Sequence, residues 1–140
     1  MAKAGSLQTK AKGGGTQLLG ADKMKAKIAK ITAKIPHAAG AALYAEALIE
    51  MAESMQRTPV DTGALRASHI THKPYLSLGG KEISVTIEVG GSAAPYALAV
   101  HEDLEAFHKT GQAKYLESTL MESARFIPER VGKRLADTIL

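Results

Sequence analysis

The spacing of apolar residues changes along the chain, and this change restricts the fold more than any other feature of the sequence. From Asp22 to Arg57 and from Ala113 to Ile139, apolar residues recur every three or four positions, as in helices with one apolar face. Residues 83–89 alternate between apolar and polar instead, as a half-buried strand does. The order of helices, strand and helices predicts an α+β fold in which long N-terminal helices and C-terminal helices pack on a small antiparallel β-sheet.

The first helical stretch is expected to begin at Asp22 and to end at a proline. Asp22 suits the N-cap position, and Pro36 predicts a break because proline lacks the backbone N–H that a helix interior needs. Apolar residues occupy one face of this helix, and lysines occupy a neighbouring face. The apolar face consists of Met24, Ile28, Ile31 and Ile35, and the lysine face of Lys23, Lys27, Lys30 and Lys34.

A second helix is expected over residues 37–57, with an apolar stripe in the core and a charged stripe in solvent. Pro59 ends this helix, because the residue before a proline is disfavoured in the helical region. Glu53 and Arg57 stand four positions apart in the favourable order, a pair that contributes about 0.2–0.5 kcal/mol. The expected core stripe is Tyr44, Leu48, Met51 and Met55, and the expected charged stripe is Glu46, Glu50, Glu53 and Arg57.

The strand and the C-terminal helices follow from local signals. Gly79-Gly80 precedes the alternating segment 83–89 and predicts a turn back to a partner strand within residues 65–78. Residues 95–107 are compatible with a strand or a short helix, and we favour the helix. A helix is expected from Ala113, and Pro128 is expected to start a last helix with apolar Val131, Leu135 and Ile139.

The charge of the chain is unevenly distributed. Residues 1–35 contain eight lysines and one aspartate, a net charge of +7, whereas residues 36–140 contain ten basic and thirteen acidic residues, a net charge of −3. Residues 1–21 are rich in Gly and Lys and lack both periodicities, so we expect an extended basic arm followed by a single domain over residues 22–140. A solvated tail, a nucleic-acid contact and a grip on an acidic neighbour all remain open for the arm. The candidate contacts with DNA or an acidic partner are Lys3, Lys10, Lys12, Lys23, Lys27, Lys30 and Lys34.

Composition excludes several classes of function. The chain has no cysteine, so it has neither disulfides nor thiolate metal ligands. Its apolar runs are shorter than a membrane span, so no membrane partner is expected. The low aromatic content, 4%, argues against a surface for stacking nucleic-acid bases.

The sequence argues against a reactive centre. A metal site is one alternative, because His101, Glu105 and His108 would share a helix face next to Glu102 and Asp103. However, the adjacent Lys109 and the lack of an HExxH spacing favour solvated charge. Ser68 and His69 are expected on opposite faces of a strand, and neither a GxSxG motif nor a phosphate-binding loop occurs. The sequence therefore predicts no enzyme, no metal and no cofactor.

Three short segments remain once the core positions are removed. Residues 59–68 (PVDTGALRAS) are expected to form a tight helix-to-strand connection, in which Asp61 can bond its own backbone two residues on and Gly63 can adopt positive φ. Residues 96–102 (YALAVHE) and 108–117 (HKTGQAKYLE) follow. In this order and spacing the three segments resemble a family of tailed-bacteriophage proteins, the neck, tail-completion or minor capsid proteins of the head–tail junction.

This resemblance covers about residues 24–126 and implies a structural protein. It implies a subunit of a cyclic homo-oligomer, with six copies, that surrounds the DNA path in the neck of the virion and is assembled in the cytoplasm of a host bacterium. The expected partners are other neck proteins, portal-side or tail-terminator proteins, and packaged double-stranded DNA through non-specific contacts. A non-specific nucleic-acid-binding module that uses the lysine-rich arm and helix is the alternative.

The same resemblance suggests two groups of site residues. The first would fix the junction after the second helix: Asp61, Thr62, Gly63, Leu65, Arg66 and Ser68. The second would face a neighbouring subunit or ring: Tyr96, His101, Glu102, His108, Gly111, Lys114 and Tyr115. The alternative for both groups is that they hold only the local fold, and turn chemistry favours that alternative for residues 61–63.

Overall fold

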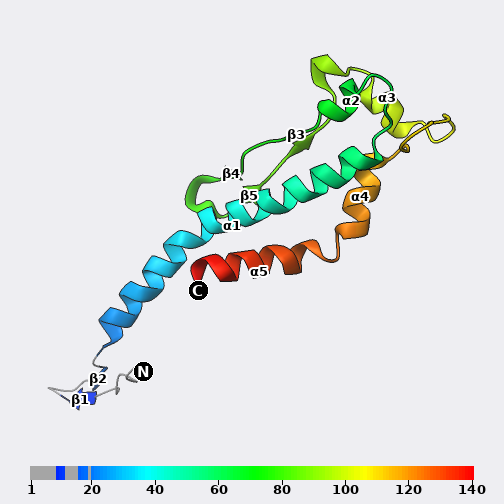
Figure 1. Ribbon diagram of the computed structural model, residues 1–140. Helices are drawn as coiled ribbons and strands as arrows, with labels where there is room; N and C mark the ends of the chain where they lie inside the picture. The colour runs from blue at the N-terminus through cyan, green and yellow to red at the C-terminus, as the bar shows by residue number, and fades with distance from the viewer. Residues whose placement is uncertain (1–8, 12–15, 19) are drawn as a thin grey trace. The chain divides into compact units, whose positions relative to one another are not determined.

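A computed structural model describes residues 9–11, 16–18 and 20–140. The described chain divides into two compact units, residues 1–35 and residues 36–140. The fold is α+β, as the sequence predicts, with one long helix, short antiparallel strand pairs and C-terminal helices (Figure 1).

The first unit contains two short strands and the first part of helix α1. Strands β1 (Thr9–Ala11) and β2 (Thr16–Leu18) pair antiparallel, a pairing that the expected extended arm did not include. Gly20 adopts φ 96°, and its carbonyl accepts the first helical hydrogen bond from the Met24 amide. Glycine permits this positive φ without a Cβ clash, so the chain turns directly into α1.

Helix α1 is a single helix, Ala21–Arg57, and the expected break at Pro36 does not occur. Proline inside a helix removes one hydrogen bond, here to the carbonyl of Thr32, but α1 continues on both sides of it. Alanine-rich sequence after Pro36 and the burial of one face from Ala38 onward favour the helix there. Asp22 lies in the first turn rather than at the N-cap, where its charge still complements the helix dipole.

The strands of the second unit form two antiparallel pairs, one inside the other in sequence. The inner pair is β4 (Tyr75–Leu76) with β5 (Ile83–Ser84), and the outer pair is β3 (Ile70–Thr71) with β6 (Ile87–Glu88). The predicted turn at residues 79–80 and the partner strand within residues 65–78 are both confirmed.

The alternating segment 83–89 is therefore not one continuous strand. Its ladder is interrupted at Val85 and Thr86, although the Thr86 carbonyl still accepts a bond from the His72 amide at 2.8 Å. The predicted faces are confirmed, because odd-numbered residues from Ile83 to Val89 are half-buried and even-numbered ones are exposed.

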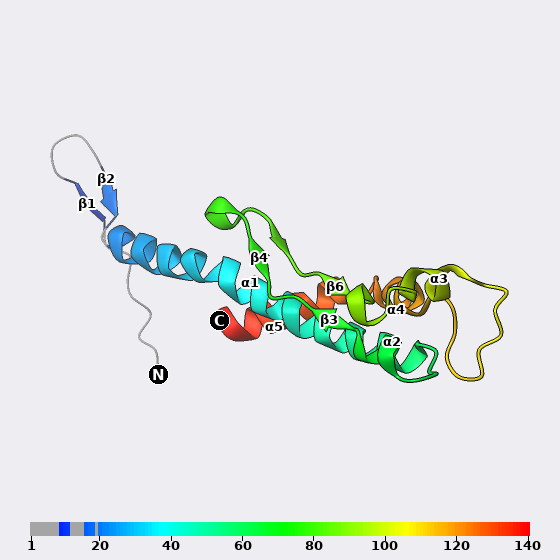
Figure 2. The same cartoon turned by 90° about the horizontal axis from the view of Figure 1, so that it is seen from above.

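The remaining helices are α2 (Ala64–Ala67), α3 (Ala97–Glu102), α4 (Tyr115–Ser123) and α5 (Ile127–Ile139). Both predicted C-terminal helices are confirmed, and Pro128 lies in the first turn of α5. The helix favoured for residues 95–107 is confirmed only for its first half, since α3 ends at Glu102. Within the second unit, the paired strands lie on one side of α1 and α5 runs along another (Figures 1 and 2).

The buried face of α1 differs from the expected one. Ala38, Ala42, Glu46, Glu50 and Ser54 follow one another at intervals of four residues, and all five are buried. Glu46 and Glu50 are only 1% and 3% exposed, whereas Leu48, placed in the core by the sequence pattern, is exposed. The expected core and solvent stripes were therefore wrong for these residues. The reason is that arginines of α5 face the two glutamates, so this face of α1 packs through charge pairs.

Candidate functional site

The three segments singled out by the resemblance meet in one small core. Leu65 of the first segment, Ala97 of the second and Tyr115 of the third are buried together with Ala94. The Tyr115 hydroxyl donates to the Ala97 carbonyl at 3.1 Å, which joins the second segment to the third. Tyr115 was expected at a subunit interface, but it is 1% exposed and belongs to the interior of its own chain. Its burial raises the pKa of the phenol.

Gly111 of the third segment allows the chain to pass close to the end of α1. It has φ 80°, and a Cβ there would lie 2.5 Å from the Pro59 nitrogen and 2.6 Å from the Thr58 carbonyl carbon. The next residue, Gln112, donates its amide to the Arg57 carbonyl at 2.8 Å. Gly111 is thus required by the fold within one chain, although it was expected at an interface.

The first segment forms a helix-to-helix junction rather than the expected helix-to-strand connection. Gly63 has φ 87°, which confirms the predicted positive φ, and it precedes α2. The Thr62 hydroxyl accepts the Ala64 amide at 3.4 Å. The expected bond from the Asp61 side chain to the backbone two residues on is not formed among the described residues. Ser68 donates to the Leu65 carbonyl at 2.6 Å and accepts the Gly90 amide at 2.9 Å, which ties the junction to the end of β6. Arg66 donates to the Thr58 carbonyl at 3.4 Å.

His69 is a buried neutral histidine and not a strand residue beside Ser68. Its Nδ1 lies 3.0 Å from the Arg66 carbonyl, which can only accept, so Nδ1 carries the proton. Nε2 therefore accepts, and the Ser54 hydroxyl lies 3.1 Å away. The Thr58 hydroxyl donates to the Ser54 carbonyl at 2.7 Å, which leaves the Ser54 hydroxyl as the donor to Nε2. Burial lowers the pKa of His69, so this network holds an uncharged ring.

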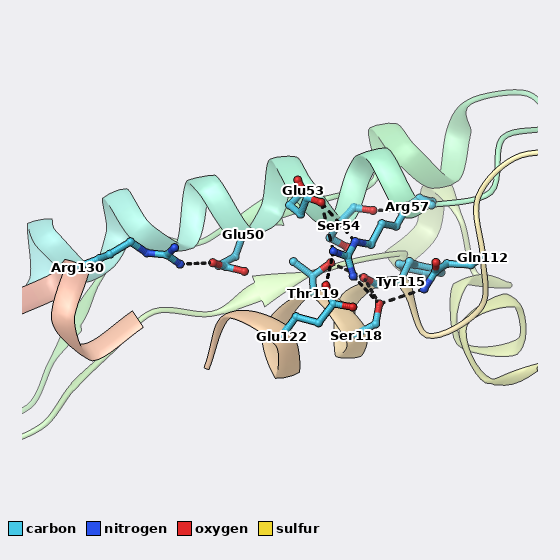
Figure 3. Close-up of polar contacts among 11 residues, drawn as sticks. Glu50, Glu53, Ser54, Arg57, Gln112, Tyr115, Ser118, Thr119, Glu122 and Arg130 are labelled. Carbon is cyan, nitrogen blue, oxygen red and sulfur yellow. Dashed lines mark hydrogen bonds and ion pairs between the residues drawn. The ribbon is translucent and has the colours of Figure 1, made fainter. Parts of the chain in front are cut away.

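Arg57, at the end of α1, connects that helix to α4 (Figure 3). Its guanidinium lies 2.7 Å from Glu122 and 3.3 Å from Glu53, and it donates to the Ser118 hydroxyl at 3.2 Å. The predicted pair with Glu53 is confirmed. The hydrogen bond from Arg57 lowers the pKa of Glu122, and the same bond raises the pKa of Arg57.

A second polar cluster covers the Tyr115 ring at the surface. His101 packs edge-on against Tyr115 with ring centroids 4.8 Å apart, and its Nδ1 lies 2.8 Å from Glu102. Lys114 lies 2.5 Å from Glu102 and 2.9 Å from Glu117. The bond from Lys114 lowers the pKa of Glu102, and Glu102 raises the pKa of Lys114. Lys114 has φ 53°, the single positive φ of a non-glycine residue in the described chain, so its backbone is strained where its side chain bridges two acids.

His101, Glu105 and His108, the metal ligands that the sequence offers, do not share a helix face. Helix α3 ends at Glu102, so Glu105 and His108 lie on the loop that follows. Within residues 20–140, His101, Glu102 and Glu117 do place ligand atoms within 4.8 Å of one another. However, the Lys114 ammonium already bridges the two carboxylates, so we interpret this group as an ion-pair cluster.

The buried glutamates of α1 face the arginines of α5. Arg130 lies 3.0 Å from Glu50 (Figure 3) and at an ion-pair distance of 2.5 Å from Glu46. Arg134 also contacts Glu46. Both arginines remain partly exposed, so the pairs seal the edge of the α1–α5 contact. A cavity of about 190 Å³ lies next to both glutamates and is otherwise lined by apolar residues, among them Leu43, Ile87, Leu120 and Ile127.

A larger cleft of about 610 Å³ opens beside the first segment. The first segment lines one side of it, and residues 107–110 line another. Tyr96 and His108, both predicted interface residues, also line the cleft, and His108 Nε2 is buried without a hydrogen-bond partner among the described residues. Phe107 and Leu104 nearby in sequence are 91% and 75% exposed. An exposed apolar area with polar neighbours is typical of a surface that contacts another protein.

The lysine face forms as predicted in the described part of the first unit. Lys23, Lys27, Lys30 and Lys34 all lie on α1 and are exposed. Lys10 lies in β1, and Lys3 and Lys12 lie outside the described residues. Within the described ranges, no helix has both the length and the apolar composition needed to cross a membrane.

Several residues that organise the second unit were missed by the sequence analysis. Ser54, Thr58 and His69 form a buried network, and Arg130 and Arg134 neutralise the buried acids. One signal was available for the charge pairs. Two glutamates four positions apart on one helix repel each other unless cations are near, and the two arginines have the same spacing.

No protein-family model, characterised protein or solved structure matches this chain.

Proposed function

We propose that this chain is a structural subunit of the neck of a tailed bacteriophage, where copies form a ring that joins the DNA-filled head to the tail. The observation that carries the proposal is the convergence of the three resembling segments, 59–68, 96–102 and 108–117, on one core. The three segments meet in space and form one structural unit, which supports treating their resemblance as one signal. The role would be structural and not enzymatic, and the location would be the virion after assembly in the bacterial cytoplasm.

The polar groups of this region support a structural role. His69, Arg57 and Lys114 are each engaged by partners in their own chain. What remains for other molecules is a cleft with exposed apolar side chains, which suits a protein neighbour such as another copy, a portal-side protein or a tail terminator.

The test is to image particles assembled without this protein. Filled heads and separate, complete tails are expected, and supplying the wild-type chain should restore joined particles. Normal infectious particles in its absence would contradict the proposal.

A non-specific nucleic-acid-binding module is the second candidate, and the exposed lysine face of α1 favours it. Binding through phosphates is steeply salt-dependent and independent of sequence. The measurement is a gel shift with duplex DNA at low and moderate salt, comparing the wild type with a Lys23, Lys27, Lys30 and Lys34 to Glu variant. Equal binding by both proteins would contradict this candidate.

A further inference from the structure

Two largely exposed surfaces of the described chain are complementary in charge. The first is the N-terminal stripe, defined as Met24, Ile28, Ile31 and Ile35 of α1. Met24 and Ile28 are 59% and 55% exposed, although their spacing is that of a helix that packs an apolar face against something.

The charges next to the N-terminal stripe define what can cover it. Residues 21–35 contain five lysines and one aspartate, and Lys27 and Lys34 directly precede two of the stripe residues. Two such helices packed on each other would bring lysines against lysines, which is unfavourable. The partner must therefore offer apolar side chains flanked by carboxylates.

The second surface, the 96–107 face, has this chemistry. Its apolar side chains are exposed, and residues 96–107 contain neither lysine nor arginine. Glu102 is paired with Lys114 of its own chain, so Asp103 and Glu105 are the acids of this face that form no ion pair among the described residues. It adjoins the 610 Å³ cleft, which has partly apolar walls. The exposed apolar residues of this face are Tyr96 and Phe107, which line the cleft, and the nearby Leu104, and its acids are Asp103 and Glu105. Leu98 lines a different hollow, next to Tyr115 and Leu116, and is not part of this face.

We propose that the N-terminal stripe of one copy docks on the 96–107 face of the next copy. Both surfaces are largely exposed in the described chain, where Ile31 of the N-terminal stripe is half-buried, so another copy can cover each of them. In this docking mode the apolar face of the helix lies in a groove of the partner copy. The side chains that enter the groove are those of the N-terminal stripe, which recur at i, i+4, i+7 and i+11. Because the two surfaces differ, the contact is head-to-tail, and repeated contacts of this kind close into a ring or continue as a filament. This inference rests on the proposed ring-forming function and names the contact that builds the ring.

The test uses the full-length chain and two exposed positions, one on each surface. Ile28→Asp places a charge in the N-terminal stripe, and Phe107→Asp places one in the 96–107 face. Sedimentation over a range of concentrations should show a wild-type oligomer and at least about tenfold weaker association for each variant. Leu78→Asp is the matched control, since Leu78 is fully exposed and lies outside both surfaces, and it should associate like the wild type.

Mixing the two variants gives the sharpest result. Each keeps the surface that the other has lost, so a head-to-tail contact predicts a heterodimer that cannot grow further. Circular dichroism of each variant checks that the fold is retained. Absence of the heterodimer when both variants are folded would overturn the inference.

Charge exchange tests the electrostatic part of the contact. Lys27→Glu with Lys34→Glu should weaken association, and mixing with the Asp103→Lys, Glu105→Lys variant should restore it. A wild type that stays monomeric, or one whose oligomer survives both aspartate substitutions, would overturn this docking mode. In the second case a ring would still exist, so the proposed function would stand and only the contact would be wrong.

Discussion

The two halves of α1 use the same helical period in opposite ways. Residues 21–35 carry a regular apolar stripe in which Met24, Ile28 and Ile35 are exposed and Ile31 is half-buried. Residues 36–57 instead bury a stripe that contains Glu46, Glu50 and Ser54. Both faces show the spacing of an amphipathic helix. The comparison shows that such spacing identifies a helix that packs against a partner. It does not identify the partner, which determines the face of the helix that is buried and whether the burial occurs within one chain or between chains.

The partner in the second half is itself charged. Arg130 and Arg134 supply the counter-charges that allow two carboxylates to be buried. Burying an unpaired carboxylate costs several kcal/mol, so the stability of this half depends on a few specific contacts. The first half has an apolar surface with no such dependence, and substitutions there should affect association more than folding.

The largest expected effect concerns the end of the buried half. Gly111→Ala would place a Cβ within 2.6 Å of backbone atoms of Thr58 and Pro59, at a positive φ that disfavours alanine. We expect the free energy of unfolding to fall by about 3 kcal/mol, measured by chemical denaturation. Gly63→Ala is the control, because its φ is also positive but no atom lies within 4 Å of the added Cβ, and about 1 kcal/mol is expected. Equal losses of stability in the two variants would show that the close approach of Gly111 to Thr58 and Pro59 is not the reason that glycine is required at position 111.

The next largest effect is expected from a substitution that removes the positive charge shared by the two buried acids. Arg130→Ala leaves Glu50 without its arginine and Glu46 with Arg134 alone, so a loss of about 2–3 kcal/mol is expected in the same measurement. Lys133→Ala changes an exposed cation on α5 and should leave stability unchanged. If both variants behave alike, the buried pairs do not hold α5 on α1.

A smaller effect depends on pH through His69. Its pKa is lowered in the folded chain, so the unfolded chain binds the proton first as the pH falls below the ordinary value of 6.5. Stability is therefore complete above that pH and decreases from there down to the folded pKa, by at most about 1.4 kcal/mol for each pH unit. Denaturation of the wild type and of His69→Gln across this range measures the difference. A pH profile identical in both proteins would contradict the assignment of a buried neutral ring.

The smallest expected effect lies in the exposed half of α1. Ile28→Ala should change the free energy of unfolding by less than about 0.5 kcal/mol, because Ile28 is exposed. The comparison is Leu65→Ala in the core, for which a loss of about 2–5 kcal/mol is expected. Both are measured at concentrations low enough to keep the chain monomeric. A loss above 2 kcal/mol for Ile28→Ala would mean that the N-terminal stripe is covered within one chain.

The sequence predicted the elements better than their environment. The α+β class, the turn at Gly79-Gly80 and the helices after Ala113 and Pro128 were predicted because periodicity and turn chemistry are local properties. The predicted break at Pro36 was wrong, because the stability of the helix on both sides of Pro36 outweighs the loss of one hydrogen bond. The core stripe was wrong because the charges of Arg130 and Arg134 act from 80 or more positions away in the chain.

For the candidate site, the sequence found the segments but not the role of each residue. Gly63 was predicted from turn chemistry, which depends on its own backbone. Gly111 and Tyr115 were expected at an interface from the resemblance. Local patterns could not reveal their roles within the chain, because their partners, Pro59 and Ala97, are not neighbours in sequence. The roles of the exposed Tyr96 and Glu102 at an interface stay predictions.

The nested arrangement of the strand pairs has a consequence for the order of folding. The inner pair, β4 with β5, closes only the short loop around residues 78–80, whereas the outer pair, β3 with β6, must enclose the inner one. Loop closure costs less entropy for shorter loops, so pairing should start at the glycine turn and spread toward Ile70 and Glu88. Changes at Gly79 should then slow refolding, while changes at the outer pair should mainly speed unfolding.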